Sequence, residues 1–138
     1  MTDKFVVDAN VVISSLINKG VPFSVFSLNS ASNKFEFIAP EFLLEEVKKH
    51  KSRVLEFTKL SEQEFEKVYE FLINEITFIP AKKFLDFLPK AKQLAPHEKD
   101  ATYIALSLAS NCPIFSGDKG LLKSKVNVIS PKELLDKF

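Results

Sequence analysis

Short apolar runs alternate with longer helical patterns along this chain, and this alternation restricts the fold more than any other feature. Five runs have the length and the β-branched or aromatic content of buried strands: residues 5–7, 35–39, 76–79, 114–116 and 126–129. Segments with helical spacing separate these runs. Strands that are joined through helices form a parallel sheet with helices on both faces. We therefore expect an α/β fold, a three-layer α/β/α sandwich around a central, mostly parallel sheet of four to five short strands.

Helix-start signals support the alternation. Ser61 and Glu64 match a capping box, in which each side chain accepts a hydrogen bond from the backbone N–H of the other residue. Ser130 and Glu133 repeat the pattern, and Pro131 suits the first position of a helix. We expect helices over residues 10–17, 22–31, 40–50 and 100–108, one helix after each capping box, and one or two short helices over the Pro89-interrupted residues 82–94.

Length and composition indicate one globular domain. The 138 residues contain 46% hydrophobic and 27% charged residues, and no repeat, linker or low-complexity tract divides them. Residues 1–138 are therefore expected to form a single domain. Fourteen residues are Phe, two are Tyr and none is Trp, which we interpret as core filling and not as a platform for stacking bases. The net charge of +1 means that any nucleic-acid footprint must be local.

We expect the protein to be cytoplasmic and not to associate with a membrane. Cys112 is the single cysteine, so an internal disulfide is excluded, and we expect a buried structural thiol in a reducing compartment. Asp8 and Asn10 interrupt the apolar run over residues 5–17, which is too short to span a bilayer and has no cleavage site. A soluble, unprocessed protein is the expectation.

Several kinds of catalytic or cofactor site are absent from the sequence. Three glycines, at positions 20, 117 and 120, cannot supply a phosphate-binding loop or a dinucleotide fingerprint. Two histidines and one cysteine match no zinc-site spacing, and no nucleophile elbow is present. The remaining chemistry belongs to carboxylates.

Three aspartates stand at strand ends or helix starts. Asp8 follows the first expected strand, Asp118 follows the fourth, and Asp100 begins a helix. Asp118 lies within residues 117–120, whose two glycines predict a turn. Taken singly, each has a structural alternative: a helix cap, a turn residue or a favourable charge at a helix start. Ligands of open α/β sheets bind beyond the carboxyl ends of the strands, where the three would meet. Carboxylates grouped there suit Mg²⁺ or Mn²⁺, whose usual role is phosphate chemistry.

Four motifs in order, VVDANVVISSL, IAPEFLLEEV, DATYIALSLA and IFSGDKGLL, resemble the PIN-domain family of metal-dependent ribonucleases over essentially the whole chain. The similarity is greatest to small, single-domain prokaryotic members, a group that includes the toxin half of VapBC-type toxin–antitoxin pairs. The acidic signature of the family corresponds here to Asp8, Glu46, Asp100 and Asp118. Two polar positions of the family correspond to Asn10 and Ser116.

The resemblance implies hydrolysis of RNA phosphodiester bonds with one or two Mg²⁺ or Mn²⁺ ions. Asp8, Asp100 and Asp118 would be metal ligands, and Glu46 would bind a second ion or activate the attacking water. Asn10 and Ser116 would orient ligands and the scissile phosphate, as residues behind metal ligands do. A small antitoxin is a possible partner.

Two glutamate assignments stay open. Helical spacing places Glu46 near the apolar side of its helix and Glu45 towards solvent, which favours Glu46 as the ligand. Glu98 precedes Asp100 by two positions, where some relatives have a further acid. It is either an outer metal contact or a solvated charge at a helix start.

A run of basic residues follows Glu46 in the sequence, and two interpretations of it are open. Lys48, Lys49, Lys51 and Arg53 are either a solvated helix end or a track for phosphates leading to the acids. Lys119, beside Asp118, carries the same ambiguity, and so do the nearby Lys123 and Lys125.

The sequence leaves two alternative functional classes open, and it also predicts an assembly with a second copy or a small partner. Aspartyl-phosphate phosphatases and receivers also place Asp after a first strand, but Asn10 stands where the phosphatase pattern has a second Asp. A catalytically silent PIN-like module that binds RNA or protein is the third reading. The apolar residues of the 61–76 region occupy more than one helix face, so we expect a homodimer or a small partner.

Overall fold

A computed structural model describes residues 3–138 of the chain. Within these residues, five parallel strands form one sheet in the order β3-β2-β1-β4-β5. The strands are β1 (Asp3–Val7), β2 (Phe35–Pro40), β3 (Ile76–Ile79), β4 (Ile114–Phe115) and β5 (Val128–Ile129). The expected parallel sheet is therefore confirmed, with β1 at its centre.

Helices connect every pair of consecutive strands. The α-helices are α1 (Ala9–Ile17), α2 (Val21–Ser32), α3 (Phe42–Phe57), α4 (Glu62–Asn74), α5 (Leu88–Leu94), α6 (Ala101–Ser110), α7 (Lys119–Leu122) and α8 (Pro131–Leu135). Three short 3₁₀ helices are η1 (Ala81–Lys83), η2 (Leu85–Phe87) and η3 (Glu98–Asp100). Residues 82–94, expected to form one or two short helices broken at Pro89, instead form parts of η1, η2 and α5, and Pro89 lies in the first turn of α5. Both capping boxes form, at Ser61 before α4 and at Ser130 before α8.

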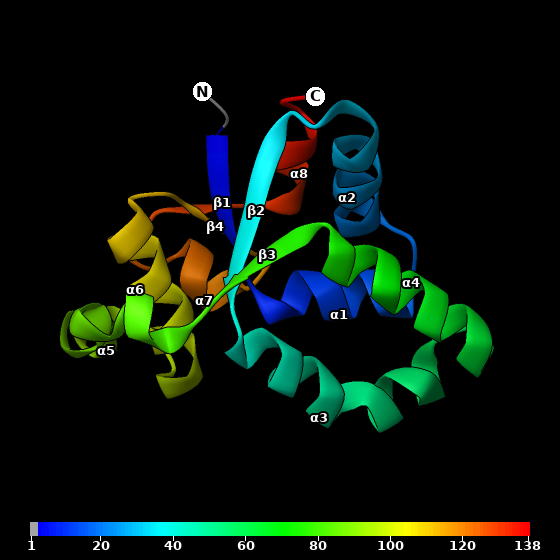
Figure 1. Ribbon diagram of the computed structural model, residues 1–138, viewed down its shortest axis with the longest axis horizontal. Helices are drawn as coiled ribbons and strands as arrows, with labels where there is room; N and C mark the ends of the chain where they lie inside the picture. The colour runs from blue at the N-terminus through cyan, green and yellow to red at the C-terminus, as the bar shows by residue number, and fades with distance from the viewer. Residues whose placement is uncertain (1–2) are drawn as a thin grey trace.

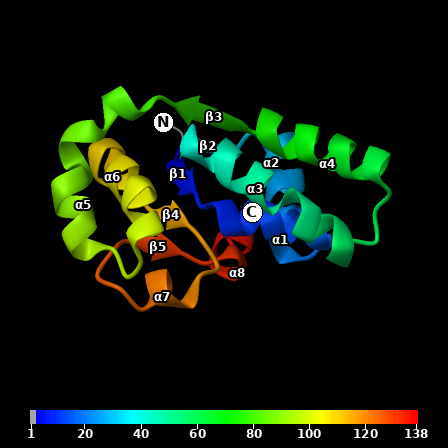
Figure 2. The ribbon, with the colours of Figure 1, turned by 90° about the horizontal axis from the view of Figure 1, so that it is seen from below.

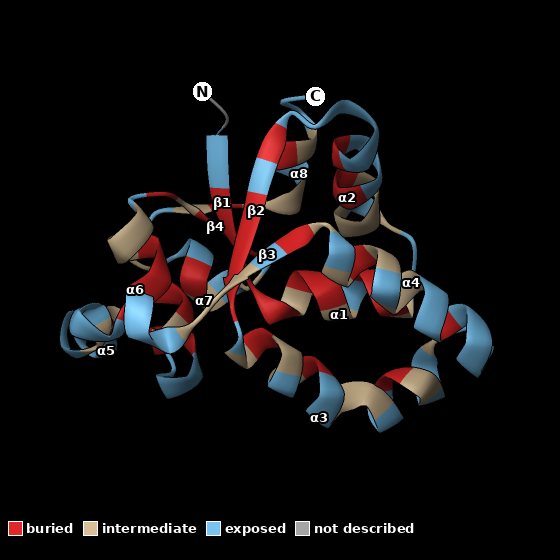
Figure 3. Ribbon diagram, viewed as in Figure 1, coloured by how far each residue is buried: buried red, intermediate tan, exposed pale blue. Residues whose placement is uncertain are grey.

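The sheet separates two layers of helices, as Figures 1 and 2 show. α5 and α6 lie on one side of it, and α1, α2, α3 and α4 lie on the other. β1 and β2 are buried on both faces near their carboxyl ends (Figure 3). The three-layer α/β/α sandwich is therefore the observed architecture.

Phenylalanine fills much of the core between the sheet and α2. The rings of Phe26, Phe37 and Phe115 lie within 5.3–5.9 Å of one another, centroid to centroid. All three are fully buried. Because the sheet is apolar on both faces, polar groups of β1 and β4 are confined to the strand ends, and the candidate site lies there.

The expected end of one helix and one expected turn were wrong. α3 continues about two turns beyond His50, because Val54 packs into the core and the Thr58 hydroxyl donates to the Leu16 carbonyl at 2.9 Å. Residues 117–120, expected as a turn, contain the start of α7, because the Asp118 side chain caps that short helix.

Within residues 3–138, no single helix has the length and apolarity to cross a membrane. α1 and α2 reach that length and composition only as a pair bent by 100°.

Candidate active site at the carboxyl ends of β1 and β4

The pairing of β1 with β4 sets the first part of the site. Val6 pairs with Ile114 and Val7 with Phe115, so Asp8 and Ser116 emerge side by side. The Asp8 backbone N–H donates to the Phe115 carbonyl at 3.1 Å, which fixes this register. The buried Ser116 hydroxyl then donates to Asp8 Oδ2 at 2.7 Å. Asp8 is the residue before α1, but its side chain makes no capping bond to that helix. A carboxylate that only capped α1 would make that bond.

The loop after β4 carries Asp118 and is hydrogen-bonded to Asn10 of α1. The Asp118 backbone N–H donates to the Ser116 hydroxyl at 3.0 Å, so this hydroxyl accepts from one residue of the site and donates to another. Asn10 Oδ1 accepts from the Gly117 N–H at 3.3 Å, and so ties the start of α1 to this loop. Asp118 Oδ2 accepts from the Leu121 N–H at 2.9 Å. The other carboxylate oxygen of Asp118 is left for a ligand.

Glu46 enters from α3. β2 ends at Pro40, and α3 begins two residues later, so Glu46 stands about one turn into the helix. The hydroxyl of Tyr103, on α6, donates to Glu46 Oε1. Tyr103 is 1% exposed, so packing fixes its ring, and its hydroxyl restrains the Glu46 carboxylate through this hydrogen bond.

Asp100 is the last residue of η3 and immediately precedes α6. Its Oδ2 accepts from the His97 backbone N–H at 3.2 Å. Asp100 is buried, whereas the charges of an ordinary exposed helix start are solvated. Helical spacing places Asp100 at the rim of the apolar stripe of α6, and this position brings its carboxylate inside the protein.

These side chains line one small cavity. It measures about 70 Å³ and is bordered by Asp8, Ala9, Asn10, Ile13, Glu46, His50, Lys99, Asp100, Tyr103 and Asp118. The structure therefore brings the four predicted acids and Asn10 together, and Ser116 bonds to Asp8 and Asp118 immediately behind them.

Burial, together with the neighbouring carboxylates, raises the pKa of two of the acids. Burial raises the pKa of Asp8 from an ordinary 3.8 to about 6. The hydrogen bond from Ser116 lowers this pKa, and the charges of Asp100, Glu46 and Asp118 raise it. Burial, followed by the charge of Asp118, also raises the pKa of Asp100. The free energy of several negative charges so close together would fall if a cation bound among them.

The donor set fits a hard divalent cation. Carboxylate and amide oxygens are ligands that Mg²⁺ and Mn²⁺ prefer. Among residues 3–138, no three acidic, histidine or cysteine side chains form a ready-made metal cage. Mg²⁺ usually keeps several waters and binds through one or two carboxylates, so the open arrangement suits it.

Comparison with known proteins identifies the family. A sequence profile described as a PIN domain matches residues 6–136. This chain belongs to the PIN-domain family. A search among curated proteins found no match. Members of this family are in general nucleases that use divalent metal ions.

Solved structures show the same fold as this PIN domain. PAE2754 from Pyrobaculum aerophilum superposes with a TM-score of 0.68 at 12% identity, over 99% of this chain and 88% of that one. VapBC2 from Rickettsia felis, whose structure is bound to a DNA fragment from its promoter, gives 0.62 at 14% identity, over 92% of this chain and 96% of that one. At these identities the likeness concerns the fold.

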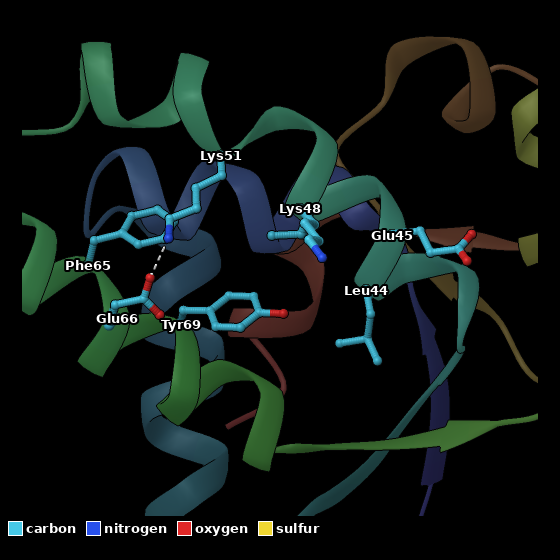
Figure 4. Close-up of a pocket in the computed structure, with 8 residues that line it drawn as sticks. Leu44, Glu45, Lys48, Lys51, Phe65, Glu66 and Tyr69 are labelled. Atoms are coloured by element: carbon cyan, nitrogen blue, oxygen red, sulfur yellow. Dashed lines mark hydrogen bonds and ion pairs between the residues drawn. The ribbon is translucent and has the colours of Figure 1, made fainter.

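The basic run of this PIN domain divides between two sides of α3. Lys48 and Lys51 line a cavity between α3 and α4 (Figure 4), which shares no lining residue with the acidic cavity. Lys51 Nζ lies 2.7 Å from Glu66 Oε1 and 4.0 Å from Glu62 Oε1. Arg53 instead lines a cavity beside the acids. Lys49 and Lys119 are exposed.

The alternatives for the glutamates also separate in space. Glu45 is exposed and lines the cavity between α3 and α4, whereas Glu46 lines the acidic cavity. Glu98 is exposed, at the start of η3.

Sequence reasoning missed three polar residues of the cavity, Tyr103, His50 and Lys99. Tyr103 lies three positions after Asp100 and therefore on the same helix face, which was a usable signal. His50 lies four positions after Glu46 and gives the same signal on α3. Lys99 precedes Asp100, and no spacing rule distinguishes it from other exposed lysines.

Proposed function

We propose that this PIN domain is a Mg²⁺- or Mn²⁺-dependent endoribonuclease. One observation carries the proposal: Asp8, Glu46, Asp100 and Asp118, from four separate segments, line the same cavity. Burial and like charge disfavour such a cluster unless a ligand compensates, so its presence is best explained by function.

The residues of the cavity would have different roles in catalysis. Asp8, Asp100 and Asp118 would hold the metal, which when bound lowers the pKa of water and neutralises charge on the scissile phosphate. Ser116 keeps Asp8 oriented by donating to its Oδ2. Tyr103 holds Glu46 Oε1 and leaves Glu46 Oε2 for a second ion or for the proton of the attacking water. Asn10 links α1 to the loop that carries Asp118 and keeps the two sides of the cavity together.

Incubation of the purified protein with pooled cellular RNA tests this proposal. Cleavage with Mg²⁺ or Mn²⁺ and none in excess EDTA is the expected result. Undiminished cleavage in EDTA would refute the metal dependence. A protein that binds RNA with metal present but never cuts it would be the silent PIN-like module. Family membership argues against the aspartyl-phosphate reading, which would require acetyl phosphate to label Asp8.

We also propose that the protein acts in the cytoplasm as the toxin of a toxin–antitoxin pair, as a homodimer or with a small antitoxin. The likeness in fold to VapBC2 supports the antitoxin. The half-buried Tyr69 and Phe71 of α4 support an interface, because a partner would cover the part of them that this domain leaves exposed. Light scattering at several concentrations, with and without co-expressed neighbouring gene products, tests the assembly; a monomer under all conditions would contradict it.

A further inference from the structure

A groove between α1 and α3 continues the acidic cavity. A second cavity, of about 310 Å³, shares Ile13 and His50 with the acidic one. A third, of about 420 Å³, shares Ile17 and Phe57 with the second. The three are therefore contiguous, and we call the second and third together the α1–α3 groove.

One face of α3 lines this path from end to end. Glu46, His50, Arg53 and Phe57 are spaced by four, three and four positions, which places them in one row along the helix. The row begins in the acidic cavity and ends at Phe57, in the second and third cavities. Lys48 lies off this row, on the α4 side of the helix (Figure 4).

The lining of the α1–α3 groove combines positive charge with apolar surface. Its cationic residues are Arg53, Lys19 and Lys59, and among residues 3–138 no acidic residue lines the second or third cavity. Ile13, Ile17 and Val54 supply aliphatic surface. A path that is acidic at one end and cationic along the rest fits a polyanion whose reactive phosphate lies at the acids.

Phe57 is the most exposed phenylalanine of the chain. It is 63% exposed, whereas most phenylalanines of the chain lie in the core or pack against it. The composition of the chain indicated core filling and no stacking platform; that expectation does not describe this position. An exposed ring beside a guanidinium is the arrangement on which single-stranded nucleic acids stack a base while a neighbouring phosphate is bound.

We propose that the α1–α3 groove binds the nucleotides of single-stranded RNA that flank the scissile phosphate. Arg53 contacts a phosphate and Phe57 stacks on a base. This inference rests on the proposed ribonuclease function and adds to it a defined substrate track. RNA is favoured over an apolar peptide because the groove is continuous with the acidic cavity and its charged residues are all cations.

Two pairs of variants test the groove. Arg53→Gln and Phe57→Leu alter it, and Lys48→Gln and Phe87→Leu are matched controls, a lysine on the other side of α3 and a phenylalanine of η2 that is 40% exposed. The probes are a fluorescein-labelled ten-nucleotide uridine RNA and a strand of equal length with abasic riboses. Anisotropy in EDTA gives Kd without cleavage, and cleavage of the uridine strand in Mg²⁺ gives kcat and KM.

Both groove variants should raise Kd and KM by roughly five- to tenfold, with kcat unchanged. Arg53→Gln should also lower the slope of log Kd against log salt by about 0.7, the value for one phosphate contact on a single strand. Phe57→Leu should leave that slope unchanged and remove the preference of the parent for uridine over abasic RNA. The two controls should match the parent.

Other results separate the two levels of the proposal. If the parent cuts RNA with Mg²⁺ and all four variants share its Kd and KM, the groove assignment is wrong and the ribonuclease stands. If the parent neither binds nor cuts RNA, both fail. Equal losses in the groove variants and the controls would overturn the groove. So would a Phe57→Leu protein that keeps its RNA affinity but loses a co-purifying protein, because the groove would then be a peptide site.

Discussion

At the scale of single residues, the structure assigns each acid of the cavity a partner that holds it in place. Asp8 accepts from Ser116, Asp100 from the His97 backbone, Asp118 from Leu121, and Glu46 from Tyr103. These bonds use one oxygen of each carboxylate. The second oxygens are therefore the candidates for contact with metal, water or substrate.

Replacing Tyr103 with Phe should weaken catalysis without changing RNA binding. The substitution keeps the buried ring and removes only the hydroxyl that donates to Glu46. Glu46 would then sample several rotamers, so kcat should fall by roughly tenfold or more while KM stays near that of the parent, the pattern for a group that acts through the transition state. The Mg²⁺ concentration for half-maximal activity should rise, and the affinity for Mn²⁺, measured by electron paramagnetic resonance, should fall. Tyr69→Phe, on α4, is the control.

The pH dependence of stability should report on Asp8. In the metal-free folded protein its pKa is about 6, against an ordinary 3.8 in the unfolded chain. Between those values the folded state binds more protons, so the free energy of unfolding falls as pH rises from 4 through 6. The contribution of Asp8 is fully present below pH 4 and is lost above pH 6, by up to about 3 kcal/mol. Urea titrations in EDTA at several pH values measure this loss.

Asp8→Asn is the comparison that isolates this effect. The amide keeps a hydrogen-bond acceptor for Ser116 but does not titrate, so the mutant should lose much less stability over the same pH range. Equal slopes in parent and mutant would assign the pH dependence to other groups.

At the scale of helices and strands, local signals were predictive and distant contacts were not. The capping boxes at Ser61 and Ser130 were recognised because all their atoms lie within four residues. The end of α3 was placed too early because it depends on Val54 in the core and on the bond from Thr58 to Leu16, across 42 positions. The start of α7 was missed because Gly117 and Gly120 suggested a turn, whereas the Asp118 side chain supplies a helix cap.

Ser61→Ala should destabilise the fold and leave cleavage unchanged. The Ser61 hydroxyl accepts from the Glu64 N–H at 3.2 Å, and losing such a cap costs about 1 kcal/mol. α4 contributes no residue to the acidic cavity, so kcat and KM should match the parent. Urea denaturation gives the first quantity and an RNA cleavage assay the second. Ser52→Ala, at an exposed position of α3, should change stability by less than about 0.5 kcal/mol. A large loss of activity in Ser61→Ala would link α4 to the site.

At the scale of the whole molecule, the site depends on a strand order that the sequence pattern does not reveal. Alternating strands and helices predicted a parallel sheet, but the pairing of β1 with both β2 and β4 depends on contacts between distant segments. The three aspartates were predicted from their places after strands or at a helix start, and Glu46 was predicted through the resemblance to PIN domains. Their partner Tyr103 was not, because a buried Tyr on an apolar helix face looks like core.

Asp100→Asn should show that function opposes stability in this fold. Removing one charge from the cluster relieves repulsion with Asp118, and the amide oxygen still accepts from the His97 N–H. The metal-free mutant should therefore melt at the same or a higher temperature than the parent. Mg²⁺ should raise the melting temperature of the parent by mass action and that of the mutant much less. Calorimetry with and without Mg²⁺ measures both shifts, and cleavage should fall by orders of magnitude.

The opposite pattern would exclude Asp100 from the site. A charge that merely favours a helix start contributes about 0.3–1 kcal/mol, so its loss would lower the melting temperature. Parental cleavage and a parental Mg²⁺ response in such a mutant would show that Asp100 is structural.

The bond between Ser116 and Asp8 spans 108 positions of the chain, and it has a consequence for biosynthesis. Contacts between such distant residues close large loops and form late in folding. A chain emerging from the ribosome carries Asp8 and Glu46 long before β4 is available to pair with β1. The acidic cavity therefore cannot form before the segment that contains β4 and Asp118 has been synthesised, so the cell is not exposed to the proposed activity until that segment has left the ribosome.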